Sequence, residues 1–388
     1  YVYFSRNSLI FLHSSTCTAQ LLRVPFVQMG VQHQRNPATS LPMNLTQRIT
    51  ALIVLTSFAI TILVAQGGNG QSVPSHHLDA GFRNTDPNFE EAAFTKMAPW
   101  VVGKLGSFLS KPTADIPRMY NDGVLLKQNK QYTITWVGHS TCFIQFEGLN
   151  ILTDPVWSDK IGPVSWAGDA RATGPGIPLE KLPPIDVVLI SHNHYDHLDE
   201  QTILTLAKNP NTKFFVPLRV RDWFEDRGIS NVEELDWREG VTYKDLKIIC
   251  APTQHFSGRW VSDRNATLWC SWVLLGKGRR LYFGGDSGYF SGFAEIGKKF
   301  GPFDLALLPI GAYEPRELMK PIHMNPADAV QAFHDLKGKK MLAIHWGTFK
   351  QTDEPLEEPP KKLREEIEKR KLQPEDFFLF MIGETREW

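Results

Sequence analysis

Short runs of consecutive apolar residues recur along the chain from residue 131 onward, and polar residues, glycine or proline separate them. A run of four to eight apolar residues bounded by turn residues is typical of a buried strand. The pattern predicts strands at residues 132–137, 142–146, 150–153, 185–190, 213–217, 246–250, 268–275, 280–283, 305–309 and 341–344.

Between these runs, the apolar residues fall at helical spacing in only a few places. Ile203, Leu204 and Leu206 follow Asp199–Glu200, so a helix with acidic residues in its first turn is expected there. Further helices are predicted at 101–109, at 326–336 and at 360–370, the last an exposed helix whose many charges face solvent. Strands that alternate with single helices predict an α/β (α+β) fold with two mixed sheets covered by helices.

One apolar run, Ala51–Ala65, carries no charged residue and differs from the others in its surroundings. A short, weakly basic stretch at 44–48 precedes it, and small and polar residues at 66–72 follow it. The run fits the apolar core of a signal peptide better than a spanning helix of about 20 residues. We therefore expect an exported, periplasmic or membrane-associated protein, with an uncleaved anchor as the main alternative.

These features divide the chain into four parts. Residues 1–42 are basic and patternless, and they are expected to be extraneous or disordered, with Met43 as a plausible start. Residues 43–72 are assigned to the signal peptide or anchor with its linker. Residues 73–128 are expected to form an N-terminal extension packed on the core, and residues 129–388 the main domain. The segment 162–184 is rich in Gly and Pro and is predicted to be a long functional loop.

Composition narrows the classes of function. The chain has 42 basic and 42 acidic residues, so no electrostatic binding of nucleic acid is expected. None of its four cysteines forms a Cys-x-x-Cys pair, which argues against a thiolate zinc site and a disulfide framework. Aromatic residues make up 11% of the chain. They indicate a large core, an apolar cleft or a membrane-facing surface, and composition does not separate these readings.

The strongest chemical signal is the stretch His192-Asn193-His194-Tyr195-Asp196-His197. It lies between the strand 185–190 and the helix that begins near Asp199, and therefore on a loop. Three imidazoles and a carboxylate suit Zn²⁺ or another borderline metal ion. These side chains are too close in sequence to surround one ion by themselves, which suggests two adjacent ions completed by distant ligands.

Three later residues of metal-binding type each follow a predicted strand directly. They are His255, Asp286 and His345. Any one of them alone could be a satisfied polar residue. Loops at one end of a sheet would bring all three beside the histidine motif, and the set of seven donors is then large enough for two ions.

Beyond the histidine motif, several longer stretches resemble the N-acylphosphatidylethanolamine-hydrolysing phospholipase D family, which has the metallo-β-lactamase fold. The stretches are 136–141 (WVGHST), 152–158 (LTDPVWS), 182–186 (LPPID), 285–289 (GDSGY), 309–316 (PIGAYEPR) and 343–348 (AIHWGT). The resemblance runs from about residue 85 to the C-terminus and leaves out residues 1–72. It implies an αβ/βα sandwich for residues 129–388.

The resemblance also implies roles for individual residues. It gives His192, His194 and His255 to one zinc ion, gives Asp196, His197 and His345 to a second, and makes Asp286 the bridge between them. His323 matches a family histidine close to the substrate phosphate, although it could instead be a structural residue at the start of the helix after Asn325–Pro326. His139 is expected to orient a ligand rather than to bind metal.

The implied reaction is hydrolysis of N-acylphosphatidylethanolamine to phosphatidic acid and an N-acylethanolamine. The attack on phosphorus is expected to come directly from hydroxide held by the two zinc ions, with Asp196, Asp286 and His323 as catalytic residues. The substrate would be a phospholipid at a membrane surface, reached through a groove walled by the N-terminal extension and the segment 162–184. A homodimer is left open.

Two other functions stay open on the sequence alone. One is a hydrolase with the same metal site that acts on a lactone or a soluble phosphodiester. The other is an exported protein that binds lipid or metal without catalysis.

Overall fold

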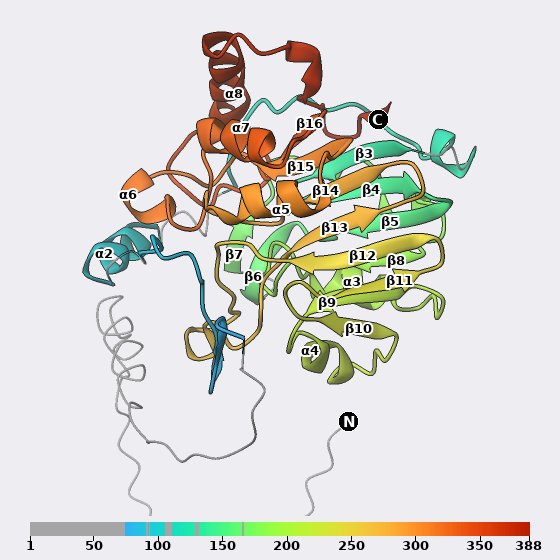
Figure 1. Ribbon diagram of the computed structural model, residues 1–388, viewed down its shortest axis with the longest axis horizontal. Helices are drawn as coiled ribbons and strands as arrows, with labels where there is room; N and C mark the ends of the chain where they lie inside the picture. The colour runs from blue at the N-terminus through green and yellow to red at the C-terminus, as the bar shows by residue number, and fades with distance from the viewer. Residues whose placement is uncertain (1–73, 91, 93, 105–110, 129–131, 165–166) are drawn as a thin grey trace, which may run out of the picture. The chain divides into compact units, whose positions relative to one another are not determined.

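The computed structural model describes residues 74–90, 92, 94–104, 111–128, 132–164 and 167–388. The main elements among these residues are two seven-stranded sheets (Figure 1). The first sheet contains β3 (Thr133–Gly138), β4 (Thr141–Phe146), β5 (Leu149–Thr153), β8 (Val187–Leu189), β9 (Lys213–Pro217), β10 (Val232–Leu235) and β18 (Thr385–Glu387). The second contains β11 (Gly240–Tyr243), β12 (Leu246–Ala251), β13 (Ser271–Leu275), β14 (Arg280–Phe283), β15 (Leu305–Pro309), β16 (Met341–Ile344) and β17 (Phe377–Phe378).

The remaining elements are short. Two small two-stranded sheets are formed by β1 (His77–Leu78) with β2 (Gly81–Phe82), and by β6 (Lys160–Val164) with β7 (Ala167–Ala170). The α-helices are α2 (Phe94–Lys104), α3 (Glu200–Leu206), α4 (Arg221–Glu225), α5 (Gly292–Phe300), α6 (Arg316–Met319), α7 (Pro326–Asp335) and α8 (Glu358–Lys369). The 3₁₀ turns are η2 (Leu125–Gln128), η3 (Leu179–Lys181), η4 (Val261–Asp263) and η5 (Pro374–Asp376).

Both large sheets are mixed and follow the same plan. The first has the strand order β10-β9-β8-β5-β4-β3-β18, and the second has the order β11-β12-β13-β14-β15-β16-β17. In each sheet one half is antiparallel and the other half is parallel. Strand β8 ends beside the parallel strands β5 and β9, so its following loop leaves the sheet at the carboxyl ends of its neighbours.

The main hydrophobic core lies between the two sheets. Trp136 and Ile144 of the first sheet belong to the same buried cluster as Trp272 and Tyr282 of the second. A second cluster covers the outer face of the first sheet, where α3 and α4 pack, and α5 and α7 cover the outer face of the second (Figure 1). The layers are therefore helix, sheet, sheet and helix, as expected for an αβ/βα sandwich.

The predicted strands agree well with the structure. The bounds at 213–217, 280–283, 305–309 and 341–344 are confirmed without change, and β8 and β13 are shorter than their apolar runs. The prediction of a single long loop at 162–184 is wrong in its first part, because β6 and β7 form a hairpin there. The predicted helix at 101–109 begins earlier, at Phe94, and residues 105–109 lie outside the described residues.

Helix α8 differs from the expectation of a purely solvated helix. Leu363 and Ile367, four residues apart, are buried on one side of it, and α8 packs against α7. An i, i+4 apolar pair places both side chains on one face, so even a strongly charged sequence can form an amphipathic helix.

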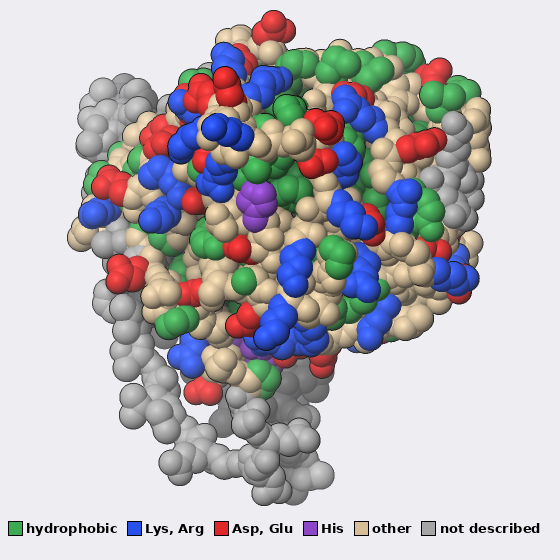
Figure 2. Space-filling view, turned by 45° about the horizontal axis from the view of Figure 1, so that its top comes forward, with side chains coloured by type: hydrophobic (Ala, Val, Ile, Leu, Met, Phe, Trp, Pro, Cys, Tyr) green, Lys and Arg blue, Asp and Glu red, His purple; other side chains and the backbone are tan. Residues whose placement is uncertain are grey.

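The described part of the N-terminal segment is in contact with the main domain. The side chain of Asn84 is hydrogen-bonded to the backbone of His255. The indole N–H of Trp100 donates a hydrogen bond to the carboxylate of Asp353. The backbone N–H of Met119 donates one to the carbonyl oxygen of Ile382. No helix within the described ranges is long and apolar enough to cross a membrane, and the run 51–65 lies outside those ranges. On the face drawn in Figure 2, acidic and basic side chains are interspersed.

Candidate metal centre

The seven predicted donors meet at one edge of the sandwich, and both sheets contribute to the group. His192, His194, Asp196 and His197 lie on the loop after β8 of the first sheet. His255, Asp286 and His345 follow β12, β14 and β16 of the second sheet. The structure therefore brings together all the residues that the sequence proposed as ligands, and their role as ligands stays a prediction.

The first group of donors consists of three imidazoles. His192 Nε2 is 2.8 Å from His194 Nδ1, and His255 Nε2 is 3.4 Å from the same Nδ1 atom. His192 and His255 are buried, and His194 is partly buried. Three ring nitrogens that face one another at these distances form the kind of nitrogen donor set that binds zinc.

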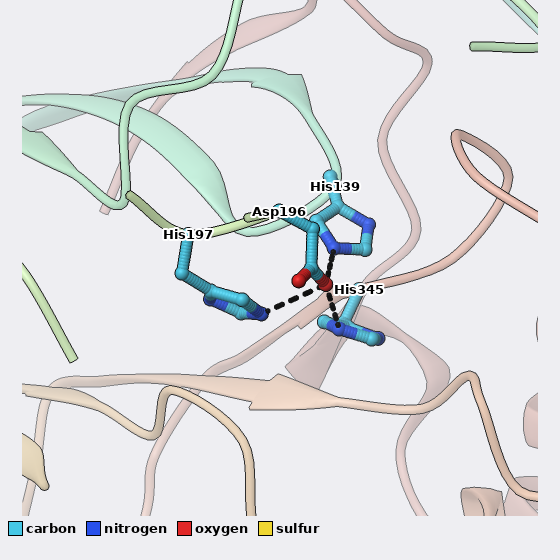
Figure 3. A group of neighbouring side chains, drawn as sticks. All are labelled: His139, Asp196, His197 and His345. Atoms are coloured by element: carbon cyan, nitrogen blue, oxygen red, sulfur yellow. Dashed lines mark hydrogen bonds and ion pairs between the residues drawn. The ribbon is translucent and has the colours of Figure 1, made fainter. Parts of the chain in front are cut away.

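The second group is centred on the carboxylate of Asp196 (Figure 3). Its Oδ2 atom is 3.2 Å from His197 Nε2, 3.5 Å from His345 Nε2 and 2.9 Å from His139 Nε2. Gln351 Nε2 donates to the same oxygen over 2.8 Å. This oxygen thus has several polar neighbours in a site shielded from water.

Asp286 lies between the two groups. Its Oδ2 atom is 3.1 Å from His345 Nε2 and 3.2 Å from His197 Nε2, and it is 3.8 Å from His255 Nε2 of the first group. A carboxylate in this place can contact ions held by either group. This position is compatible with the bridging role that the family resemblance implies for Asp286, and the role stays a prediction.

The donors fit a pair of metal ions in spacing and in chemistry. Zinc–nitrogen bonds of 2.0–2.1 Å in tetrahedral geometry put neighbouring ligand atoms about 3.3 Å apart, close to most of the separations above. In addition, His197 Nε2, His345 Nε2 and Asp286 Oδ1 are buried and make no well-aligned hydrogen bond among the described residues, although carboxylate oxygens lie close to both nitrogens. Buried polar atoms without partners are costly, and coordination to an ion would satisfy them.

The side chains of the predicted ligands are held by further contacts behind them. Asp154 Oδ2 lies 2.6 Å from His197 Nδ1 and accepts a hydrogen bond from Ser191 Oγ over 2.6 Å. His255 Nδ1 lies 2.9 Å from the carbonyl oxygen of Ile322. Such partners fix which ring nitrogen faces the metal.

Burial and mutual charge shift the ionisation of the site. Burial alone would raise the pKa of Asp286, but His345 and His197 beside it hold that pKa well below its usual value. The pKa of His345 rises to about 9, because Asp286 and Asp196 outweigh the burial that would lower it. Burial lowers the pKa of His255 to about 3 and that of His194 to about 4, so both rings are neutral at pH 7 and available as ligands.

Several residues of the site have a left-handed backbone. The φ angles are 59° at His345, 54° at His139 and 32° at Asp154. This conformation is uncommon for residues other than glycine and costs of order 1–3 kcal/mol each. At these three positions the surrounding structure holds the chain in a strained form.

The donor groups open into a cavity of about 450 Å³. Asp196, Asp286 and His323 line one part of it, and Ile161, Pro163 and Phe256 line another. His323 Nδ1 is buried without a partner and lies 3.9 Å from Asp286 Oδ2. The histidine therefore faces the site, and it is not only a residue preceding the helix α7, whose N-cap is Asn325.

Two contributors to the site were missed by sequence reasoning. Asp154 stands in one of the resemblance stretches but was given no role, and Gln351 had no motif at all. Only the folded chain shows that Asp154 contacts His197 and that Gln351 contacts Asp196. His139 contacts Asp196 as well, which agrees with an orienting role.

Comparison with known proteins places this geometry in a family. Residues 149–346 match the model of the beta-lactamase superfamily domain. The N-acyl-phosphatidylethanolamine-hydrolyzing phospholipase D 1 of Caenorhabditis elegans is 41% identical over 266 residues, which cover 65% of this chain and 75% of that protein. An uncharacterized protein of Mycobacterium tuberculosis is 39% identical over 297 residues, or 71% of this chain and 78% of that protein.

Solved structures show the same fold. The isothiocyanate hydrolase from Delia radicum gut bacteria superposes with a TM-score of 0.52 and 21% sequence identity, over 66% of this chain and 99% of that chain. At this level of identity the likeness concerns the fold alone.

Proposed function

The chain belongs to the metallo-β-lactamase superfamily and is a metal-dependent hydrolase, and on this basis we propose that it cleaves N-acylphosphatidylethanolamine in the manner of a phospholipase D. The observation that carries the proposal is the position of the donors. Seven histidine and aspartate side chains converge at one place, and three of them, His194, Asp196 and Asp286, line a cavity that also has apolar walls. The 41% identity to the nematode enzyme supports the choice of substrate.

The proposed metal is zinc, with two ions per chain. His192, His194 and His255 would hold one ion, Asp196, His197 and His345 the other, and Asp286 would contact both. When bound, the pair would supply Lewis acidity, which activates water near neutral pH and neutralises charge on a phosphodiester.

The protein side chains have separate tasks in this proposal. Burial lowers the pKa of His323 to about 3, so its ring is neutral at pH 7 and serves as a hydrogen-bond donor to a phosphate oxygen. His139 and Gln351 hold Asp196 from two sides. Ile161, Pro163 and Phe256 keep water away from one wall of the cavity and provide contact for hydrocarbon.

Exposed apolar side chains support a lipid substrate. On α2, Val101 and Val102 are exposed, the latter by 63%, and Trp260 beside η4 is exposed by 64%. Tryptophan is enriched where proteins meet the membrane–water interface. These side chains would contact the apolar part of a membrane that presents the phospholipid substrate.

We further propose that the run 51–65 directs the chain to a membrane or across it. The run lies outside the described residues, so the proposal rests on the sequence. The chain expressed from Met43 in a bacterium is expected in the periplasmic or membrane fraction. Intact protein, with its N-terminus complete, in the cytosolic fraction would refute this.

The activity is tested with purified protein and vesicles that contain N-acylphosphatidylethanolamine. Mass spectrometry should detect N-acylethanolamine and phosphatidic acid in equal amounts, and a chelator should abolish both products. His334 lies on α7, outside the predicted ligand set, so His334→Ala is a suitable control with an expected rate near that of the wild type. Turnover of lactones or soluble phosphodiesters, with none of the lipid, would show that the proposed substrate is wrong.

A further inference from the structure

A third group of metal-binding side chains lies apart from the site described above. It consists of His76, His77 and Asp236. The two histidines belong to the N-terminal segment at β1, and Asp236 follows β10 of the first sheet. Nothing in the sequence pattern or in the proposed reaction gives these three residues a role.

Both histidines direct the same ring atom at one carboxylate. His76 Nε2 is 2.6 Å from Asp236 Oδ1, and His77 Nε2 is 2.8 Å from Asp236 Oδ2. Consecutive residues in a strand point to opposite faces of a sheet. Here the chain turns at residues 75 and 76, which brings both rings to the same side with their centroids 4.5 Å apart.

The arrangement exceeds what an anchor for the segment needs. One histidine hydrogen-bonded to Asp236 would already tie the segment to the domain, whereas two imidazoles and a carboxylate form a donor set that binds divalent transition metals. His76 is 2% exposed, but the side chain of His77 is 26% exposed. The group is therefore closed on the side of His76 and open to water on the side of His77.

Contacts around the group hold its members in place. The ring of His76 is stacked on Trp237 with centroids 4.4 Å apart. The backbone N–H of Trp237 donates to Asp236 Oδ1 over 2.6 Å, and that of Asp236 donates to Glu239. Oriented ligands lose less freedom on binding an ion, and metal sites generally have such supporting contacts.

The segment that carries His76 and His77 continues to Asn84, which contacts His255 of the candidate metal centre. Asn84 Nδ2 donates to the carbonyl oxygen of His255 over 2.8 Å, and the backbone N–H of His255 donates to Asn84 Oδ1. Phe82, between the two contacts, is buried. An ion held by His76, His77 and Asp236 would fix this segment. It would thereby also fix the backbone of His255, one of the predicted ligands of the candidate metal centre.

We propose that His76, His77 and Asp236 form a separate binding site for a divalent first-row transition-metal ion such as Zn²⁺. The ion would bind Nε2 of both imidazoles, each a neutral ring in the tautomer that carries its proton on Nδ1, together with the carboxylate of Asp236. The site is structural, and it secures the N-terminal segment against the catalytic domain.

The test counts metal ions in the full chain. Protein stripped with chelator is incubated with Zn²⁺, freed of excess by gel filtration and analysed for zinc by mass spectrometry. His77→Gln removes one ligand at the open side, and His334→Gln removes a histidine outside every group of donors within the described residues. We expect His77→Gln to hold about one ion fewer per chain than both the wild type and His334→Gln. Equal zinc content in all three would overturn the proposal.

A second measurement does not depend on how the variant folds. Crystals of the wild type grown with Zn²⁺ and measured at the zinc absorption edge should show an anomalous peak bounded by His76, His77 and Asp236. Its absence, in a map that shows zinc at His192 and His255, would also overturn the proposal. These outcomes are independent of the lipid activity, because neither measurement involves a substrate.

Discussion

At the residue scale, the candidate centre depends on a few side chains, and His255 is one of them. His255 Nε2 is the donor that the second sheet provides to the group of His192 and His194. Loss of one of three imidazole ligands weakens zinc binding severely. We expect His255→Ala to lose metal and lipid hydrolysis together. Elemental analysis and the vesicle assay measure both, with His334→Ala as the control, and full metal content in the variant would contradict the assignment.

Asp154 acts one step behind the donors. Its carboxylate accepts a hydrogen bond from Ser191 Oγ and contacts His197 Nδ1. It therefore selects the tautomer of His197 in which Nε2 faces the centre. Asp154→Asn keeps the shape but removes the charge, and removal of such a partner typically costs about 10–100-fold in metal affinity. A zinc titration with a competing chelator would measure this. Unchanged affinity would show that the contact does not orient His197.

The histidines also limit the route of cleavage. Many phospholipases D form a phosphohistidine with a His-x-Lys-x₄-Asp motif, and none of the twelve histidines here is followed two residues later by lysine. Water should then attack phosphorus directly, and hydrolysis in ¹⁸O-water should label phosphatidic acid and leave the N-acylethanolamine unlabelled. Dilute ethanol should give no phosphatidylethanol, because no phosphoryl-enzyme exists to be intercepted. Substantial phosphatidylethanol would count against direct attack.

At the scale of elements, the site depends on how each strand ends. Gly285, which follows β14 and precedes Asp286, has φ +56°, and a Cβ atom there would lie 2.6 Å from Ser191 Cβ. Gly285→Ala should therefore lower the free energy of unfolding by about 1–3 kcal/mol and weaken metal binding. A Cβ atom at Gly278 meets nothing within 4 Å, so Gly278→Ala is the matched control. Denaturant unfolding would measure the free energy of unfolding of both variants. Equal values for Gly285→Ala and Gly278→Ala would refute the steric argument.

The sequence predicted the elements that are buried and apolar, and it missed those that are not. Strands such as β15 and β16 are continuous apolar runs buried on both faces, and their bounds follow from the pattern alone. Strand β18 is polar and largely exposed, and only its pairing with β3 makes it a strand. In β6, Gly162 and Pro163 are residues that normally interrupt strands, so its hairpin could not be predicted.

The same distinction applies to the site. The ligand candidates could be predicted because each belongs to a metal-binding type and follows an apolar run. Gln351 and Asp154 could not, because their importance lies in contacts with Asp196 and His197 that only the fold creates. The sequence around a polar loop residue does not show which side chain that residue will contact in the folded protein.

At the scale of the whole molecule, the candidate centre joins the two sheets. Four of its donors come from the loop after β8 in the first sheet, and three come from loops of the second. Ions bound there would link the halves of the sandwich across the edge of their shared core. Binding to the folded state alone adds about 4 kcal/mol of stability at a free metal concentration 1,000 times the dissociation constant.

This gives a prediction for thermal unfolding. Protein with zinc should have a Tm about 10 °C higher than protein stripped by a chelator, because each kcal/mol is worth about 2–4 °C in a domain of this size. Added zinc should restore the higher Tm. The double variant His192→Ala/His255→Ala, which lacks two of the three imidazoles of the first group, should show a clearly smaller rise under the same conditions. If wild-type protein of verified zinc content melted at the same temperature with and without the metal, the centre would not link the sheets, and its donors would have to act in catalysis alone.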